Sequence, residues 1–173
     1  MAHYAKIGLN NKVIQVVPFD DNKILDANGV EQEEVGRRIL ENETGWPLWI
    51  KCSIGTFENK HYTFNSDGSR SLSTDQSKAF RGNFPALGGL WDEENNVFFP
   101  VKTYPSWQKN ILNCKWEAPV TYPSVKTFTK DGITFEYDIF WNEEQQRWES
   151  KTGKSNSGID KYWNSSTLSW NNI

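Results

Sequence analysis

The chain has few of the residues that carry most enzyme chemistry. It contains two histidines and two cysteines in 173 residues, and no serine or cysteine stands in a nucleophile-elbow motif. It lacks a glycine-rich phosphate-binding loop, and the turn-like stretch Asp26–Gly29 does not continue with the spacing of a calcium loop. These absences predict a protein that is not an enzyme, with no catalytic residue, no metal ligand and no cofactor.

A basic field is missing as well. The net charge is −3, and lysine and arginine are scattered singly among carboxylates, which disfavours a nucleic-acid surface. No apolar run approaches the roughly 18 residues that span a bilayer, so membrane insertion is not expected. The first residues lack the features of a secretion signal, which predicts folding in a cytoplasm. Cys52 and Cys114 show no CxxC spacing and are expected to be buried free thiols.

Aromatic residues are abundant, with nine Trp, ten Phe and six Tyr. Such a density favours sheets and contact surfaces. Many of these rings are expected to form the core in place of scarce leucine and isoleucine. Exposed ones could instead stack on sugars, cage a quaternary amine or anchor a protein interface.

Residues 1–55 predict a ββαβ unit. His3–Gly8 and Lys12–Phe19 are two strand-like runs joined by an Asn-rich turn. Apolar residues at helical spacing predict a helix over Glu31–Glu43, with Gly45 as its C-cap. Trp46–Ser53 then returns to extended structure. The fold class predicted for the whole chain is α+β and predominantly antiparallel β.

The next segment, residues 56–84, is polar and turn-rich and predicts an exposed loop region. Residues 85–149 instead repeat one pattern, in which an aromatic residue, a short polar stretch and a second aromatic residue follow each other. With the C-terminal segment there are four such units: Trp91–Phe98, Trp107–Trp116, Trp141–Trp148 and Trp163–Trp170. Their spacings are odd, so each predicts a hairpin with its two aromatic residues opposite each other on one face.

Two further patterns support this Trp-hairpin region. Ile133, Phe135, Tyr137, Ile139 and Trp141 alternate with polar residues and so share one strand face. Proline-containing connectors recur at residues 100–106 and 119–124, and they are expected to run as extended edges or linkers.

The C-terminal residues 150–173 predict a flexible spacer, Ser150–Gly158, followed by the last hairpin. An isolated hairpin is marginally stable in water. The hairpins therefore need a surface to pack on, and the last one is expected to dock on another chain. The acidic groups at Asp92–Glu94 and Glu143–Glu144 fall at hairpin tips, where solvated turn residues are expected rather than paired glycosidase acids.

Several segments resemble one group of proteins closely. They are Met1–Val17, Asp26–Glu34, Gly45–Trp49, Tyr104–Trp107, Leu112–Pro119 and Trp163–Trp170. Across about two thirds of its length the chain resembles small virion or tail-fibre-associated structural proteins of tailed phages that infect marine cyanobacteria and related ocean bacteria. Phe57–Ser77 departs from that group, and Lys130–Trp148 is an additional hairpin. Choline-binding repeats are similar only superficially, because they depend on glycines and a regular period.

The resemblance implies a non-catalytic structural part of a phage virion, made in the host cytoplasm and assembled in symmetric multiple copies with other virion proteins. A tail or fibre position is expected, with capsid decoration and a carbohydrate-binding module for host envelope glycans as alternatives. Binding would use aromatic anchors and sheet edges. The candidate residues are Trp107, Trp116, Trp163, Trp170, Tyr104 and Tyr122.

Overall fold

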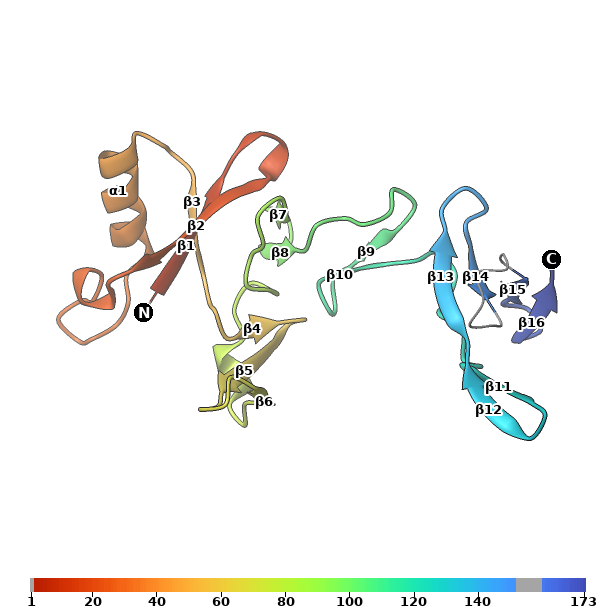
Figure 1. Ribbon diagram of the computed structural model, residues 1–173. Coiled ribbons are helices and arrows are strands. Elements are labelled where there is room, and N and C mark those ends of the chain that lie inside the picture. Colours follow the sequence, from red (N-terminus) through yellow and green to blue (C-terminus); the bar gives the residue numbers. More distant parts are fainter. Residues whose placement is uncertain (1, 152–159) are drawn as a thin grey trace. The chain divides into compact units, whose positions relative to one another are not determined.

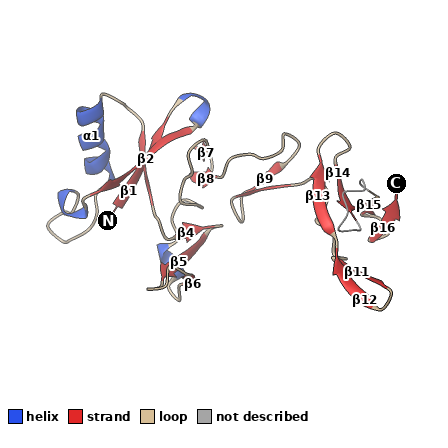
Figure 2. Cartoon of the chain, viewed as in Figure 1, coloured by secondary structure: helices blue, strands red, loops and turns tan. Residues whose placement is uncertain are grey.

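The computed structural model describes residues 2–151 and 160–173, and it divides the chain into two compact units. Unit 1 is Met1–Thr103 with Lys109–Trp116, and unit 2 is Tyr104–Gln108 with Glu117–Ile173. Antiparallel strands dominate the described residues, with a single α-helix among them (Figures 1 and 2). The predicted fold class is confirmed. None of the helices in this part of the chain is long and apolar enough to cross a membrane.

Most elements before residue 103 are short. They are β1 (Ala2–Ile7), the 3-10 turn η1 (Leu9–Asn11), β2 (Val13–Phe19), η2 (Asp21–Lys23), α1 (Glu33–Thr44), β3 (Trp49–Cys52), β4 (Thr56–Phe57), β5 (Lys60–Phe64), β6 (Arg70–Leu72), η3 (Gln76–Lys78), β7 (Leu90–Asp92) and β8 (Val97–Phe99). The later strands are β9 (Gln108–Asn110), β10 (Lys115–Glu117), β11 (Thr127–Lys130), β12 (Ile133–Glu136), β13 (Asp138–Asn142), β14 (Arg147–Lys151), β15 (Lys161–Asn164) and β16 (Ser169–Asn172).

The predicted ββαβ unit is confirmed. Its strands form an antiparallel sheet in the order β2-β1-β3, so β1 lies in the middle. Because successive side chains of a strand point to opposite faces, β1 contributes to two small cores. Tyr4 packs with Leu40 and Trp49 on the α1 side, and Ile7 packs with Trp91 on the other side.

Helix α1 lies close against β1 (Figure 1). Glu33 and Glu34 occupy its first turn, where carboxylates complement the helix dipole, and Gly45 ends it with a positive φ of 66°. Gly36 permits the close approach, since a Cβ there would lie 2.2 Å from the Tyr4 hydroxyl oxygen. That hydroxyl donates a hydrogen bond to the Glu33 carbonyl at 3.1 Å.

The prediction of a loop region over residues 56–84 is wrong for its first part. Strands β4, β5 and β6 form a three-stranded antiparallel sheet there. The side chains of β6 are exposed, and all of those of β5 are exposed or half-buried. Neither strand therefore has the buried apolar face that marks a strand in a sequence.

Unit 2 is built on a four-stranded sheet in the order β13-β14-β15-β16, with β11 and β12 as a separate hairpin. The C-terminal hairpin β15–β16 was expected to dock on another chain. In the structure it instead pairs with β14 of its own chain, through Glu149 with Tyr162 and Ser150 with Lys161. Trp163 joins Trp141 and Trp148 in the core of this unit. Beyond Lys151, the predicted spacer lies outside the described residues.

We expect Trp163→Ala to lower the free energy of unfolding by about 3–5 kcal/mol, as is usual when a buried tryptophan is truncated. Trp163 is 4% exposed and packs against Trp170 at 5.4 Å between ring centroids. Urea unfolding followed by circular dichroism measures the change. Trp163→Phe, which keeps an aromatic ring in the core, should cost less. Equal stability of Trp163→Ala and the unmodified chain would contradict docking of the hairpin within the chain.

Candidate binding site

Four hairpins of the chain share one loop conformation. In each, a four-residue turn separates two short strands, and the last residue of the turn has a positive φ. These residues are Asn96 (55°), Cys114 (54°), Gln146 (47°) and Leu168 (51°). Four-residue hairpin loops are commonly built around a type I turn, and the left-handed residue returns the chain to the second strand. The four hairpins are therefore structural repeats as well as sequence repeats.

A side chain at the start of each loop fixes this conformation. An Asp or Asn at the last position of the first strand accepts a hydrogen bond from a backbone N–H of the loop, which is the usual Asx turn. The acceptors and donors are Asp92 with Asn95 (3.1 Å), Asn110 with Leu112 (2.9 Å), Asn142 with Gln145 (2.9 Å), and Asn164 with Ser166 (3.0 Å) and Thr167 (3.2 Å).

Three of the hairpins carry the predicted aromatic pair. Trp91 lies opposite Phe98, Trp141 opposite Trp148 and Trp163 opposite Trp170. Their ring centroids are 4.7, 5.1 and 5.4 Å apart, respectively. Such pairs add about 0.5–1.5 kcal/mol beyond the burial of their area.

The predicted pairing of Trp107 with Trp116 is wrong. Trp107 precedes β9 and belongs to unit 2, where it contacts Tyr104 (5.0 Å), Trp148 (6.1 Å) and Trp141 (6.5 Å). Trp116 belongs to unit 1 and packs on Phe99 at 5.2 Å. The common loop begins at Asn110, so the repeated seven-residue spacing runs from Lys109 to Trp116.

The second tryptophan of a hairpin also holds a connector. The indole N–H of Trp116 donates to the Pro100 carbonyl at 2.8 Å, that of Trp148 to Val120 at 2.9 Å, and that of Trp170 to Val125 at 2.7 Å. Pro100 lies in the connector just before its hairpin, whereas Val120 and Val125 lie before β11, far in sequence from the hairpins of Trp148 and Trp170. We name these three contacts the indole clasps. They satisfy a polar group of each ring and fix its orientation.

The predicted binding residues differ in exposure. Trp163 is buried in the core of unit 2 and is not available to a partner. Trp107, Trp116, Trp170 and Tyr104 are half-buried, and Tyr122 is 48% exposed. The Tyr122 ring stands edge-on to Trp148 at 4.8 Å, with the Lys126 ammonium 5.8 Å from its centre. Tyr122 is therefore the most accessible of the six.

A row of rings missed by the sequence prediction extends from Trp170. Tyr137 lies 4.9 Å from Trp170, Phe128 lies 4.9 Å from Tyr137, and Phe135 lies 5.5 Å from Phe128. Phe128 and Phe135 are a cross-strand pair of β11 and β12. The alternation over residues 133–141 predicted one strand, but the structure divides it into β12, which pairs with β11, and β13, which pairs with β14. Phe128, on β11, carried no such signal.

Two acidic residues expected at solvated hairpin tips are held by donors instead. Asp92 is 5% exposed and accepts from the Lys109 ammonium at 2.5 Å. Glu143 accepts from Ser106 and from the Trp141 indole N–H. Burial opposes ionisation of Asp92, but the donors Lys109 and Asn95 outweigh it and lower the pKa of this carboxyl.

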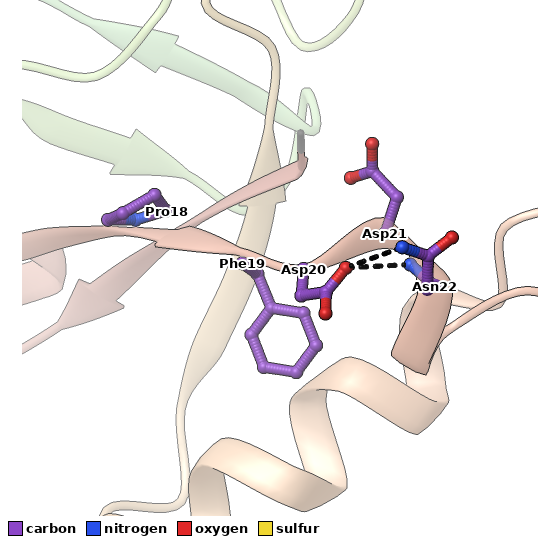
Figure 3. A pocket seen from close by; sticks show the side chains of 5 residues that line it. All are labelled: Pro18, Phe19, Asp20, Asp21 and Asn22. Atoms are coloured by element: carbon purple, nitrogen blue, oxygen red, sulfur yellow. Dashed lines mark hydrogen bonds between the residues drawn. The ribbon is translucent and has the colours of Figure 1, made fainter.

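Two hollows of unit 1 are lined mainly by turn residues and strand ends. One, of about 480 Å³, is lined by Pro18, Phe19, Asp20, Asp21 and Asn22 (Figure 3). Within it Asp20 accepts two hydrogen bonds of 3.1 Å from Asn22, which is ordinary turn chemistry (Figure 3). A second hollow of about 310 Å³ includes Lys51, Cys52 and Phe80. Neither of these two hollows is lined by a histidine.

Both cysteines are free and buried, as expected. Burial raises the pKa of Cys52 to about 12, so its thiol is protonated at neutral pH. In residues 2–151 and 160–173, no group of three or more His, Cys, Asp or Glu side chains is placed to hold a metal ion.

Comparisons of the chain with protein-family models, with curated proteins and with solved structures find no match. The arrangement of its side chains must therefore carry any functional proposal.

We expect Leu168→Gly to raise the free energy of unfolding by about 0.5–1 kcal/mol, because glycine adopts a positive φ without the steric cost of an L side chain. Leu168 is 62% exposed, so little packing is lost. Thermal unfolding measures the gain. Ser165→Gly, in the same loop but without a positive φ, should destabilise instead. A loss at both positions would contradict the common loop geometry.

We expect Asp92→Asn to be less stable than the unmodified chain at pH 7, by about 1–3 kcal/mol, because Lys109 loses its charged partner. The pKa of Asp92 is lowered on folding, so its contribution is complete above the ordinary value of 3.8 and falls away below it. Urea titrations between pH 2 and pH 7 should show a smaller acid-induced loss for the variant. The exposed neighbour variant Glu93→Gln should behave like the unmodified chain.

Proposed function

We propose that the chain is a non-catalytic structural component of a phage virion, associated with the tail or its fibres, which binds neighbouring virion proteins through its Trp hairpins. The indole clasps are the observation that carries this proposal. They hold the half-buried rings of Trp116 and Trp170 in fixed positions, and the clasp of the buried Trp148 fixes the ring on which Tyr122 packs. Because these rings are already held in place, they lose little conformational freedom when a partner packs on them, which favours affinity.

The distribution of aromatic residues supports contact with proteins. Tyrosine and tryptophan anchors that are partly exposed and surrounded by packed neighbours are typical of interface hot spots. In unit 2, Tyr122 projects beside the buried Trp148, and Trp170 continues into the row Tyr137, Phe128 and Phe135. The resemblance of Met1–Val17, Gly45–Trp49 and Trp163–Trp170 to phage structural proteins supports the virion setting.

Quantitative mass spectrometry of purified phage particles tests this proposal. A few to a few dozen copies per particle, relative to the major capsid protein, would support a tail or fibre position. Hundreds of copies would move the chain to the head surface as a decoration protein. Absence from particles would overturn the virion proposal. The alternative, a carbohydrate-binding module for host envelope glycans, would then be tested by binding to a glycan array.

We expect Tyr122→Ala to reduce the number of copies in particles by about tenfold or more, as is usual for the loss of an aromatic anchor. The chain should remain folded, because this ring is 48% exposed. Val125→Ala is a suitable control, since that side chain is 41% exposed while the carbonyl that accepts from Trp170 is retained. Equal incorporation of Tyr122→Ala and the unmodified chain would exclude Tyr122 as an anchor.

A further inference from the structure

The β4–β5–β6 sheet of unit 1 has one face that is both aromatic and basic. The strand pairs are Phe57 with Lys60, Tyr62 with Leu72 and Phe64 with Arg70. Since side chains alternate along a strand, these six side chains lie on the same face. None of the six is acidic. Phe64 is 51% exposed and Leu72 is 57% exposed, so an apolar area lies uncovered beside two cations.

Arg70 is held in place on this face without using its charge. Its guanidinium carbon lies 4.1 Å from the centre of the Phe57 ring and 5.7 Å from that of Tyr62. Among the described residues, neither Arg70 nor Lys60 has a carboxylate partner. A guanidinium that is stacked on an aromatic ring keeps its N–H groups directed outward, where they fit a carboxylate with two parallel hydrogen bonds.

The edge of the same sheet is open. The order β4-β5-β6 leaves β6 with one unpaired side. Asn65 donates to the Ser69 carbonyl and Ser73 donates to the His61 carbonyl, so Ser69 and Ser73 bond toward β5. By the alternation of an antiparallel ladder, the N–H and C=O groups of Arg70 and Leu72 point away from β5. An exposed row of this kind is a template for another strand.

We propose that this face and edge bind an extended, acidic peptide segment of a neighbouring protein, which adds a strand to β6. The backbone of the segment would bond to Arg70 and Leu72. Its carboxylates would meet Arg70 and Lys60, and its apolar side chains would cover Phe64 and Leu72. The segment must be acidic because both charges on the face are positive and unpaired. This inference rests on the proposed function, because the neighbouring protein that supplies the acidic segment would be another virion protein.

An NMR titration of the full, isotope-labelled chain tests the proposal with defined probes. They are a capped peptide of about ten residues that alternates glutamate and valine, the matching lysine and valine peptide, and a thymidine oligonucleotide of similar length. We expect the acidic peptide alone to shift the amide signals of Lys60–Phe64 and Arg70–Leu72. No shift up to about 1 mM, or equal shifts from the basic peptide, would overturn the proposal. Binding of the oligonucleotide instead would make this face a nucleic-acid surface.

Four variants separate the contributions of charge and strand addition. Arg70→Glu should weaken binding of the acidic peptide by at least about tenfold, whereas Lys130→Glu, an equal charge change on the exposed part of β11, should leave it unchanged. Leu72→Pro removes an outward N–H without disturbing the ladder to β5 and should abolish strand addition, while Leu72→Ala should only weaken it. Unchanged binding in Arg70→Glu or Leu72→Pro would overturn the proposal. If the acidic peptide does not bind but the chain is present in phage particles, only the strand-addition proposal fails. The two proposals can therefore fail separately.

Discussion

A two-stranded hairpin buries too little to be stable by itself, and this constraint governs the second half of the chain. Three of the four hairpins pair aromatic residues across their strands, but a pair of rings still leaves one side open to water. The indole clasps solve this problem by drawing an extended connector onto the second ring. Pro100, Val120 and Val125 lie outside the strands, so their carbonyls remain available to accept from the indoles.

Unit 1 meets the same shortage of apolar surface differently. Its central strand β1 is buried on both faces, so a six-residue strand serves two cores. The polar groups that come with this arrangement are paired. Arg81 reaches Glu33 at 2.6 Å and the Lys51 carbonyl at 2.8 Å, and it thereby joins the loop before β7 to the helix and to β3. A side chain with several fixed donors suits such a junction, because it satisfies groups from separate elements at once.

The sequence was most informative where local signals agreed. The helical spacing of apolar residues, the acidic first turn and Gly45 together located α1 to within about two residues at its start. It failed where no side of a strand is buried, as for β5 and β6. It also misplaced the second hairpin, because the aromatic residues were counted from Trp107 while the loop is set by Asn110 and the positive φ of Cys114. The sequence could not predict which indoles face the core. Trp163 and Trp170 have the same local pattern, and only tertiary packing decides which of the two is buried.

The indole clasps limit how such a chain can change its length. The turn of each hairpin is fixed by its own Asp or Asn, but Trp148 bonds to Val120 and Trp170 bonds to Val125, which are distant in sequence. A hairpin of unit 2 therefore cannot be removed as a whole without releasing a connector and opening the core that Trp141, Trp148 and Trp163 share.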